Sequence, residues 1–426
     1  MIKKDQIGLW LQLIFVFFLP LWQQVSVVSL IALIVFAIFS GSWKGSLKLF
    51  RDDKVLWLFV AFYLIHVLGI FYSQNMDYGF FDLQVKLSYL FIPLFLAAIL
   101  IQTVNLKKIK WSFIMGNTLA GIICLAIAIF RYTNDGQASH FFYIDFSHFL
   151  HTTYFSMYLN LSVIFLIDEW LKKTDPSSGK RIFVPVLALF LLIIIILLFA
   201  RTALAVCFFT IFLFLVLNRK RWLRDRQKIV FLLLAGLLIV SFQFTVLHFN
   251  NRFVQVENVM QHSGETLNEN SLSADSLKSE EENSTSTRLR LWKNALLLIE
   301  QHPIFGVGTG DIKDELNAEY TSTGYDYGAK GDFNPHNQYL HTTVMLGLFG
   351  LIVLLAFILI PLRISSYSRN WVYFSFLLIV LLNSFTESIL EVQKGVLWAA
   401  YFQVLFYMNC KFRQNDLCMK IDKTSE

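Results

Sequence analysis

Residues 182–217 have the sequence IFVPVLALFLLIIIILLFARTALAVCFFTIFLFLVL, in which two long apolar runs meet at Arg201. Runs of roughly 15 to 20 apolar residues have about the length that a helix needs to cross a lipid bilayer. Similar runs, bounded by short polar or basic stretches, recur from one end of the chain to the other. The pattern is typical of an all-α, polytopic membrane protein.

The composition agrees with this fold class. Of the 426 residues, 56% are hydrophobic and only 15% are charged, whereas soluble domains contain roughly 25% charged residues. A soluble globular enzyme is therefore excluded. The four cysteines fall in apolar segments and in the C-terminal tail, so none is placed to form a disulfide in an extracytoplasmic loop.

The apolar runs predict about twelve membrane spans. They lie near residues 7–22, 25–43, 55–71, 83–101, 111–130, 152–167, 182–200, 203–217, 229–247, 338–360, 371–384 and 396–409. Spans 1 to 9 thus occupy residues 1–247 and spans 10 to 12 residues 338–409, with a long loop at 248–337 and a tail at 410–426.

Lysines and arginines gather in alternate connections between these spans. With the N-terminus in the cytoplasm, about 25 of the 36 lie on the cytoplasmic side, as expected from the tendency of basic loops to stay there. Both termini are therefore predicted to be cytoplasmic, and the 248–337 loop lies on the other side of the membrane. The basic connections are too short to fold, so the net charge of +6 does not indicate nucleic-acid binding.

The long loop contains three different stretches. Residues 261–287 are rich in Ser, Glu and Asn and are predicted to be flexible. Residues 288–301 have apolar side chains at helical spacing, which predicts an amphipathic helix on the membrane or on the helix bundle. These side chains are Leu289, Trp292, Leu296 and Ile299. The glycines of FGVGTGDI, residues 305–312, follow this helix and not a strand, which favours a tight loop over a nucleotide-binding fingerprint.

Ionisable side chains cost roughly 2.5–3.5 kcal/mol each at the middle of a membrane helix, and here they gather at one end of the spans. Those at or near the outer interface are Lys86, Arg131, Arg201, Arg288, Arg290, His336, His341, Glu387, Glu391 and Lys394. This one-sided distribution favours a reaction site on the outer surface over an ion path through the membrane.

Arg201 and His336 are the leading candidates for function. Arg201 lies between two spans, where an arginine that reaches to lipid headgroups is the structural alternative. Lys86 has the same two interpretations, as a phosphate contact or a headgroup contact. His336 is suited to take a proton from a sugar hydroxyl, and an interfacial histidine without a catalytic role is the alternative. The sequence has no DxD-type carboxylate pair, which argues against a metal-dependent enzyme that uses nucleotide sugars.

Residues 284–352 resemble the O-antigen ligase and O-antigen polymerase-like membrane glycosyltransferases. STSTRLRLWKNALLLIEQHPIFGVGTGDI and NPHNQYLHTTVMLGLFGL are similar to the family's Arg, Trp, HP-x-x-G-x-G and HN-x-x-L…G-L-x-G pattern. The Ala-Arg-Thr at Arg201 is similar to its Ser-Arg-Thr element, and ESILEVQKG, residues 387–395, to an element before the last span. Met345 departs from the family, which often has an acidic residue before the glycine of the HN motif.

The resemblance implies a GT-C-like enzyme of the bacterial inner membrane that acts on the periplasmic face without a metal or other cofactor. It implies transfer of a glycan from an undecaprenyl-diphosphate carrier to a saccharide acceptor such as the lipid A core, with inversion at the anomeric carbon. The diphosphate is assigned to Arg201 and Arg288, and the acceptor hydroxyl to His336 as general base. The expected helpers are Arg290 and Lys86 at the diphosphate and Asn337, His341, Glu387 and Glu391 as supporting residues.

Three acceptors remain open at this point. A ligase uses the lipid A core, a polymerase uses another carrier-linked repeat, and a protein oligosaccharyltransferase uses a Ser or Tyr side chain. We rank the ligase first. The alternative of a different class is a transporter of lipid-linked glycans, which should show charges deep in several spans or broken paired helices.

The predicted topology has a direct test. Single cysteines at positions 270 and 325 should react with an impermeant thiol reagent added to intact cells, because both lie in the outer loop. A cysteine at position 223 should stay unlabelled because it lies in a basic, cytoplasmic connection. Labelling at 223 would reverse the orientation and place the expected site on the wrong face.

Overall fold

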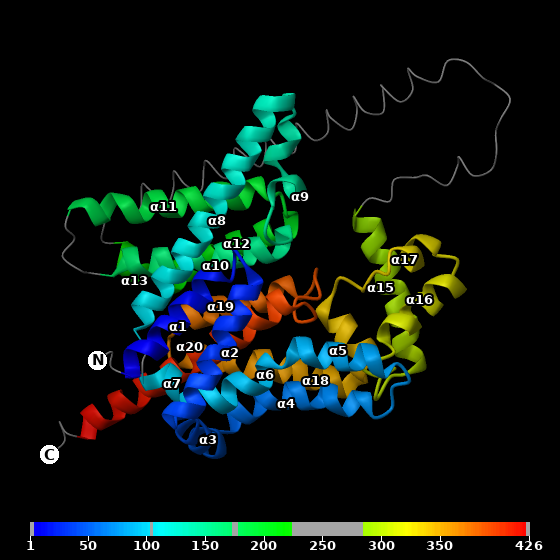
Figure 1. The fold of residues 1–426 in the computed structure, drawn as a ribbon, viewed down its shortest axis with the longest axis horizontal. Coiled ribbons are helices and arrows are strands. Elements are labelled where there is room, and N and C mark those ends of the chain that lie inside the picture. Colours follow the sequence, from blue (N-terminus) through cyan, green and yellow to red (C-terminus); the bar gives the residue numbers. More distant parts are fainter. Residues whose placement is uncertain (1–3, 103–104, 173–177, 224–283, 423–426) are drawn as a thin grey trace. The chain divides into compact units, whose positions relative to one another are not determined.

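The computed structural model of the protein describes residues 4–102, 105–172, 178–223 and 284–422, and the regular elements in these residues are helical (Figure 1). They are α1 (Lys4–Phe18), α2 (Gln23–Ser40), α3 (Ser42–Asp52), α4 (Lys54–Ile70), α5 (Met76–Lys86), α6 (Ser88–Phe91), the π-helix η1 (Ile92–Leu96), α7 (Ala97–Gln102), α8 (Leu106–Asp135), the 3₁₀-helix η2 (Ala138–Phe141), α9 (Tyr143–Phe146), α10 (Thr152–Leu171), α11 (Ser178–Leu197), α12 (Arg201–Leu217), α13 (Arg219–Trp222), α15 (Ser284–Gln301), α16 (Ile312–Ser322), α17 (Asp326–Lys330), α18 (Gln338–Tyr367), α19 (Trp371–Asn383) and α20 (Gln393–Asp422). The predicted all-α fold class is confirmed for this part of the chain.

The chain divides into two compact units, residues 1–217 with 288–426, and residues 218–287. Of the second unit, the structure describes 218–223, which contain α13, and 284–287, the first turn of α15. Most of the stretch predicted to be flexible, 261–287, lies outside the described residues. Its end, 284–287, forms the first turn of α15, and the flexibility of the stretch stays a prediction. All candidate site residues lie in the first unit.

Three helices in the described residues, α2, α8 and α18, are long and apolar enough to cross a membrane, and counting each of two bent pairs as one span raises the number to five. The pairs are α3 with α4, bent by 96°, and α5 with the segment Ser88–Leu100, bent by 42°. Shorter apolar helices lie within α1, α11, α12 and α19. These helices support a multi-pass membrane protein. About twelve spans remain a prediction, and the predicted span at 229–247 lies outside the described residues.

The predicted span at 83–101 is a series of short helices in the structure. α5 ends at Lys86, and the chain bends at Leu87 before α6 begins. Pro93 then lies in the π-helix η1, where the lack of a proline N–H removes one α-helical hydrogen bond. Lys86 is therefore the last residue of α5 and not part of a long membrane helix. Its side chain is wholly buried.

The core of the first unit surrounds α10. Every residue from Thr152 to Asp168 is buried, as expected for a helix that is covered on all sides, and α10 contacts α8, α11, α12 and α19. Much of the packing is aromatic. The rings of Phe113, Phe165 and Phe376 lie around Phe402 of α20, at centroid distances of 5.0, 6.1 and 6.2 Å. The high phenylalanine content of the sequence is thus used in the centre of the helix bundle.

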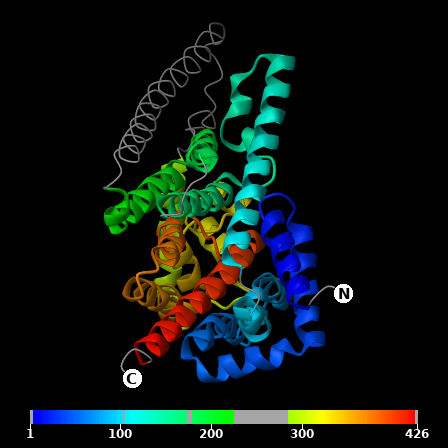
Figure 2. The same ribbon diagram turned by 90° about the vertical axis from the view of Figure 1, so that its left-hand side faces the viewer.

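α4, α5 and α18 form the part of the unit that carries the candidate site. α4 contacts both α5 and α18, and α20 runs past α5, α6, α7 and α19 (Figures 1 and 2). The connection from α19 to α20 therefore lies within reach of the first turn of α18 and the end of α5.

The glycine-containing loop after α15 is a tight structural loop, as the sequence predicts. The N–H groups of Val307 and Gly308 donate to the carbonyls of Val344 and Met345 in α18, at 2.9 Å each. The Thr309 N–H donates to the Gly69 carbonyl in α4 at 3.3 Å. The loop is consequently held between α4 and α18, and its N–H groups are occupied by protein acceptors.

α18 is broken where this loop meets it. Gly347 has φ +64° and ψ −163°, far from helical values. Beyond it, the N–H groups of Leu348 and Phe349 donate to the carbonyls of Pro303 and Ile304, at 2.9 and 3.4 Å. The loop thus supplies acceptors for N–H groups that have no partner within the interrupted helix. A break in a membrane helix is tolerated only where the freed backbone groups find such partners.

α15 packs on this arrangement through Leu291, Ala295 and Leu298, which are buried in a cluster with residues of the loop, α16 and α18. Of the predicted apolar positions, Ile299 is partly buried against this cluster, whereas Leu289 and Leu296 are exposed. The predicted helix is therefore present, beginning at Ser284 and ending at Gln301 before Pro303.

Gly347→Ala should destabilise the protein strongly. An added Cβ would overlap the Ile304 carbonyl, and the cost should exceed the roughly 1–3 kcal/mol of an unfavourable φ alone. Gly324→Ala is the matched control, because Gly324 also has a positive φ, +70°, but its Cβ would meet open space. Thermal unfolding in detergent should show a much larger loss of stability for Gly347→Ala than for Gly324→Ala. Equal losses of stability would contradict the close packing of the Gly347 break against the loop.

Candidate active site

His336 lies in a short irregular segment, residues 334–337, that leads into α18. Its backbone φ is +46°, which costs a non-glycine residue roughly 1–3 kcal/mol. The His336 N–H donates to the Asn334 Oδ1 atom at 2.8 Å. The carbonyl of Pro335 accepts from Trp292 Nε1, on α15, at 2.9 Å. These contacts hold the backbone of His336 in its strained conformation.

Asn337 is the N-cap of α18. Its Oδ1 atom accepts from the N–H groups of Tyr339 and Leu340, at 3.0 and 3.1 Å, and so satisfies two of the free N–H groups at the helix start. The capping bond fixes the point at which the helix begins, immediately after His336.

The connection between α19 and α20, residues 384–392, packs against the same segment. The Gln338 N–H donates to the Ser384 carbonyl at 2.8 Å. The Leu390 N–H donates to the Gln338 Oε1 atom at 2.7 Å. Gln338 is therefore hydrogen-bonded near both ends of this connection. We call the connection the 384–392 loop.

Glu387 of this loop contacts the imidazole of His336. The Nδ1 atom of His336 lies 2.9 Å from the Glu387 Oε1 atom, and the His336 side chain is 32% exposed while that of Glu387 is 9% exposed. The pair is thus buried on its carboxylate side and open on its imidazole side. A group that approaches from outside can reach the ring.

The surroundings of Glu387 keep its carboxyl ionised. Burial alone would raise the pKa of Glu387. The hydrogen bond from His336 and the attraction of His336, His151 and Arg288 outweigh burial, so the pKa lies below its usual value. An ionised carboxylate can only accept hydrogen bonds. The Nδ1 atom of His336 must therefore carry the proton, and in the neutral ring Nε2 has a free lone pair.

Further nitrogen groups surround this pair. Arg288 is on α15, His151 immediately precedes α10, and both lie close enough to Glu387 to lower its pKa. Lys394, at the start of α20, donates to the Phe149 carbonyl at 2.9 Å. The charges of Arg288 and His151 thus act on Glu387, the partner of His336, although these residues come from segments distant in sequence.

The other two arginines expected at the diphosphate lie near aromatic rings. The guanidinium of Arg290 is 5.6 Å from the centre of the Tyr325 ring. Arg201 is exposed at the start of α12, with its guanidinium 5.9 Å from the centre of the Phe199 ring. Among the contacts of the described residues, none joins Arg201 to His336 or Arg288.

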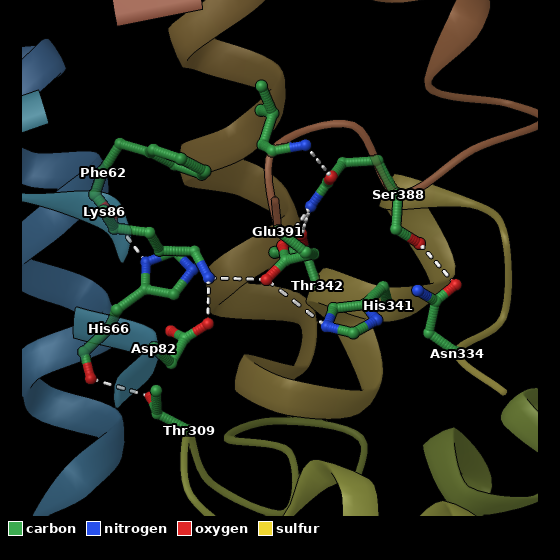
Figure 3. Close-up of polar contacts among 12 residues, drawn as sticks. Phe62, His66, Asp82, Lys86, Thr309, Asn334, His341, Thr342, Ser388 and Glu391 are labelled. Carbon is green, nitrogen blue, oxygen red and sulfur yellow. Dashed lines mark hydrogen bonds and ion pairs between the residues drawn. The ribbon is translucent and has the colours of Figure 1, made fainter. Parts of the chain in front are cut away.

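Lys86 lies in a buried cluster with two carboxylates. Figure 3 shows its ammonium between Asp82 and Glu391; it contacts the Asp82 Oδ1 atom and lies 2.5 Å from the Glu391 Oε2 atom. The His341 Nε2 atom is 3.4 Å from the same Glu391 oxygen. Gln338 Nε2 donates to the Glu391 Oε1 atom at 2.5 Å. A phosphate contact by Lys86 would require these ion pairs to open.

Asp82 and Gln338 are not among the site residues predicted from the sequence. The i, i+4 spacing of Asp82 and Lys86 was a usable signal, because such pairs face each other on a helix. His336 and His341 contact different carboxylates, Glu387 and Glu391. Each histidine is thus paired with a carboxylate about fifty positions away in sequence, and only the fold brings the two segments together.

Comparison with known proteins supports the resemblance seen in the sequence. A family model described as O-antigen ligase matches residues 186–355, a range that includes Arg201, Arg288 and His336. Lys86, Glu387 and Glu391 lie outside it. The resemblance to O-antigen ligase-like proteins is thereby confirmed.

A curated protein of Haemophilus influenzae (strain ATCC 51907 / DSM 11121 / KW20 / Rd), titled "Uncharacterized protein", is 36% identical over 90 residues. The match covers 20% of this chain and 21% of that protein. The chain thus spans about a fifth of the length of this relative. The match assigns no activity to the chain.

Glu387→Gln should lower stability at neutral pH and much less at low pH. Because the pKa of Glu387 is depressed in the folded state, its contribution is present above the unfolded value of ~4.3 and is lost as pH falls through the folded value. We expect a loss of about 1–3 kcal/mol at pH 7. Unfolding in detergent at pH 7 and near pH 3.5 measures the difference.

Glu300→Gln serves as the matched control, because Glu300 is an exposed carboxylate on α15. It should leave stability unchanged at both pH values. A deficit for Glu387→Gln that is equally large at low pH would contradict an ionised Glu387 in the folded state.

Proposed function

We propose that this O-antigen ligase-like protein is a membrane glycosyltransferase that moves a glycan from an undecaprenyl-diphosphate carrier to a saccharide acceptor, the lipid A core, on the periplasmic face. The observation that carries the proposal is the partly exposed His336, whose Nδ1 atom contacts the buried carboxylate of Glu387. We also propose about twelve spans, a GT-C-like arrangement and an inner-membrane location with cytoplasmic termini.

His336 is the general base in this proposal. Glu387 accepts from Nδ1 and leaves Nε2 free to take the proton of an acceptor hydroxyl. As that proton moves to Nε2, the acceptor oxygen forms a bond to the anomeric carbon of the donor. The bond from that carbon to the diphosphate oxygen breaks, and its electron pair leaves with the diphosphate. Attack opposite the leaving group inverts the anomeric centre.

Arginines stabilise the leaving diphosphate. A guanidinium offers a planar fork of donors that suits phosphate oxygens and stays charged at all relevant pH values. We assign Arg288 to this role because its positive charge acts on Glu387, the partner of His336, and Arg290 follows on the same helix. We assign Arg201 as the second diphosphate ligand, with no metal ion required.

Aromatic rings beside His336 suit a sugar. The Phe333 ring centre lies 6.2 Å from that of His336, and the Tyr327 ring lies 5.4 Å from Phe333. Tyr327 is 56% exposed. Flat apolar surfaces next to a few polar groups are usual in sites for small polar ligands. A saccharide acceptor could rest on these rings with a hydroxyl at His336.

Other acceptors give related functions. A polymerase would use a second carrier-linked repeat, and a protein O-oligosaccharyltransferase would use a Ser or Tyr side chain. A transporter of lipid-linked glycans is the alternative outside this class. Surface polysaccharide from a deletion strain separates the ligase from the polymerase: loss of all capped core indicates a ligase, and capping by single repeats indicates a polymerase.

Arginine and histidine variants should fail in different ways. Arg201→Ala and Arg288→Ala should weaken donor binding and turnover together, since the diphosphate charge is present before reaction and grows during it. Lysine at either position should rescue only in part. His336→Ala should keep donor binding while turnover falls by roughly 10²- to 10⁴-fold.

The measurements are transfer from an undecaprenyl-diphosphate-linked glycan in the presence of EDTA and binding of undecaprenyl diphosphate. Arg363→Ala is the control, because Arg363 is exposed near the far end of α18. Full activity of His336→Ala would remove the base assignment. Abolition by EDTA would remove the metal-independent mechanism.

A further inference from the structure

We propose that Lys86 is a positioning residue: its buried ion pair with Glu391 holds the 384–392 loop, and with it Glu387, against His336. The catalytic part of this inference rests on the proposed function. The structural part, that Lys86 orders the loop, can be tested independently of any activity.

The ion pair is deeply buried on both sides. The Lys86 side chain is 0% exposed and the Glu391 side chain 8% exposed, with 2.5 Å between the Nζ and Oε2 atoms. Removal of one partner from such a pair leaves an uncompensated buried charge, which is strongly unfavourable. In the case of Lys86 the consequence is sharper, because Asp82 and Glu391 would then face each other as two carboxylates.

A chain of contacts leads from this pair to the candidate active site. Glu391 accepts from Gln338 Nε2 at 2.5 Å, and Gln338 Oε1 accepts from the Leu390 N–H at 2.7 Å. Gln338 lies two positions after His336, and Glu391 lies four positions after Glu387. A shift of Glu391 therefore moves the two segments that carry the imidazole and its carboxylate partner.

The geometry distinguishes this role from a direct phosphate contact. Lys86 is inside the unit and already contacts two carboxylates (Figure 3), so these contacts would have to open before its ammonium could bind phosphate. If Lys86 binds phosphate, loss of Lys86 should weaken donor binding, whereas loss of Glu391 should leave donor binding intact or improve it. If Lys86 acts through Glu391, loss of either residue should give the same defect.

The test compares Lys86→Met, Glu391→Gln and the double variant. Each single variant should speed amide hydrogen exchange in the 384–392 loop and lower kcat by roughly 10- to 100-fold, as misplacement of a catalytic group by about 1 Å does. The Kd for undecaprenyl diphosphate should stay at the wild-type value. The double variant should be no worse than the poorer single variant, because the two residues act as a unit.

Lys110→Met is the matched control. Lys110 forms another mostly buried ion pair, 3.1 Å from Asp168, and its loss should leave exchange in the 384–392 loop unchanged. Glu391→Gln preserves shape and keeps the proposal testable if Lys86→Met fails to insert.

Two outcomes would overturn the proposal. One is weaker binding of undecaprenyl diphosphate by Lys86→Met with normal binding by Glu391→Gln, which would make Lys86 a phosphate ligand. The other is amide hydrogen exchange in the 384–392 loop that stays at the wild-type rate in both variants. Faster exchange in a protein whose wild type transfers no glycan would uphold the positioning role and refute the proposed function instead.

Discussion

The break in α18 at Gly347 is the constraint on which the rest of the site depends. Backbone groups freed by the break pair with the loop that follows α15, through bonds from Val307, Gly308, Leu348 and others. The same loop also reaches α4 through Thr309. α15, which carries Arg288, and α18, which begins just after His336, are thereby joined through backbone atoms, whose geometry varies little with side-chain identity.

The polar site is assembled from segments that enter from different helices. His336 comes from the start of α18, Glu387 from the 384–392 loop, and Arg288 from α15. Each is held by contacts outside the reacting groups, such as the Trp292 bond to Pro335 and the Gln338 bond to Ser384. A mobile imidazole would lose the orientation that leaves Nε2 free, so these outer contacts are part of the chemistry proposed for it.

Local signals made part of this predictable from sequence. The helix that ends before Pro303, the tight glycine loop and a helix that starts after His336 all follow from neighbouring residues. The apolar spacing of α15 left both the membrane and the helix bundle open as its neighbours, because the side that faces the protein depends on the loop beneath it. The partner of Lys86 was missed because Glu391 lies 305 positions away, and no local pattern records a contact of that separation.

The placement of the glycine loop also sets an order of events during synthesis. Its acceptors belong partly to α4, which leaves the ribosome early, and partly to α18, which leaves it after the loop itself. The loop is synthesised before α18, so it cannot complete its backbone bonds until Val344 and Met345 have also been made. The segment that joins α15, which carries Arg288, to α18 therefore reaches its final structure only after the first half of α18 has been synthesised.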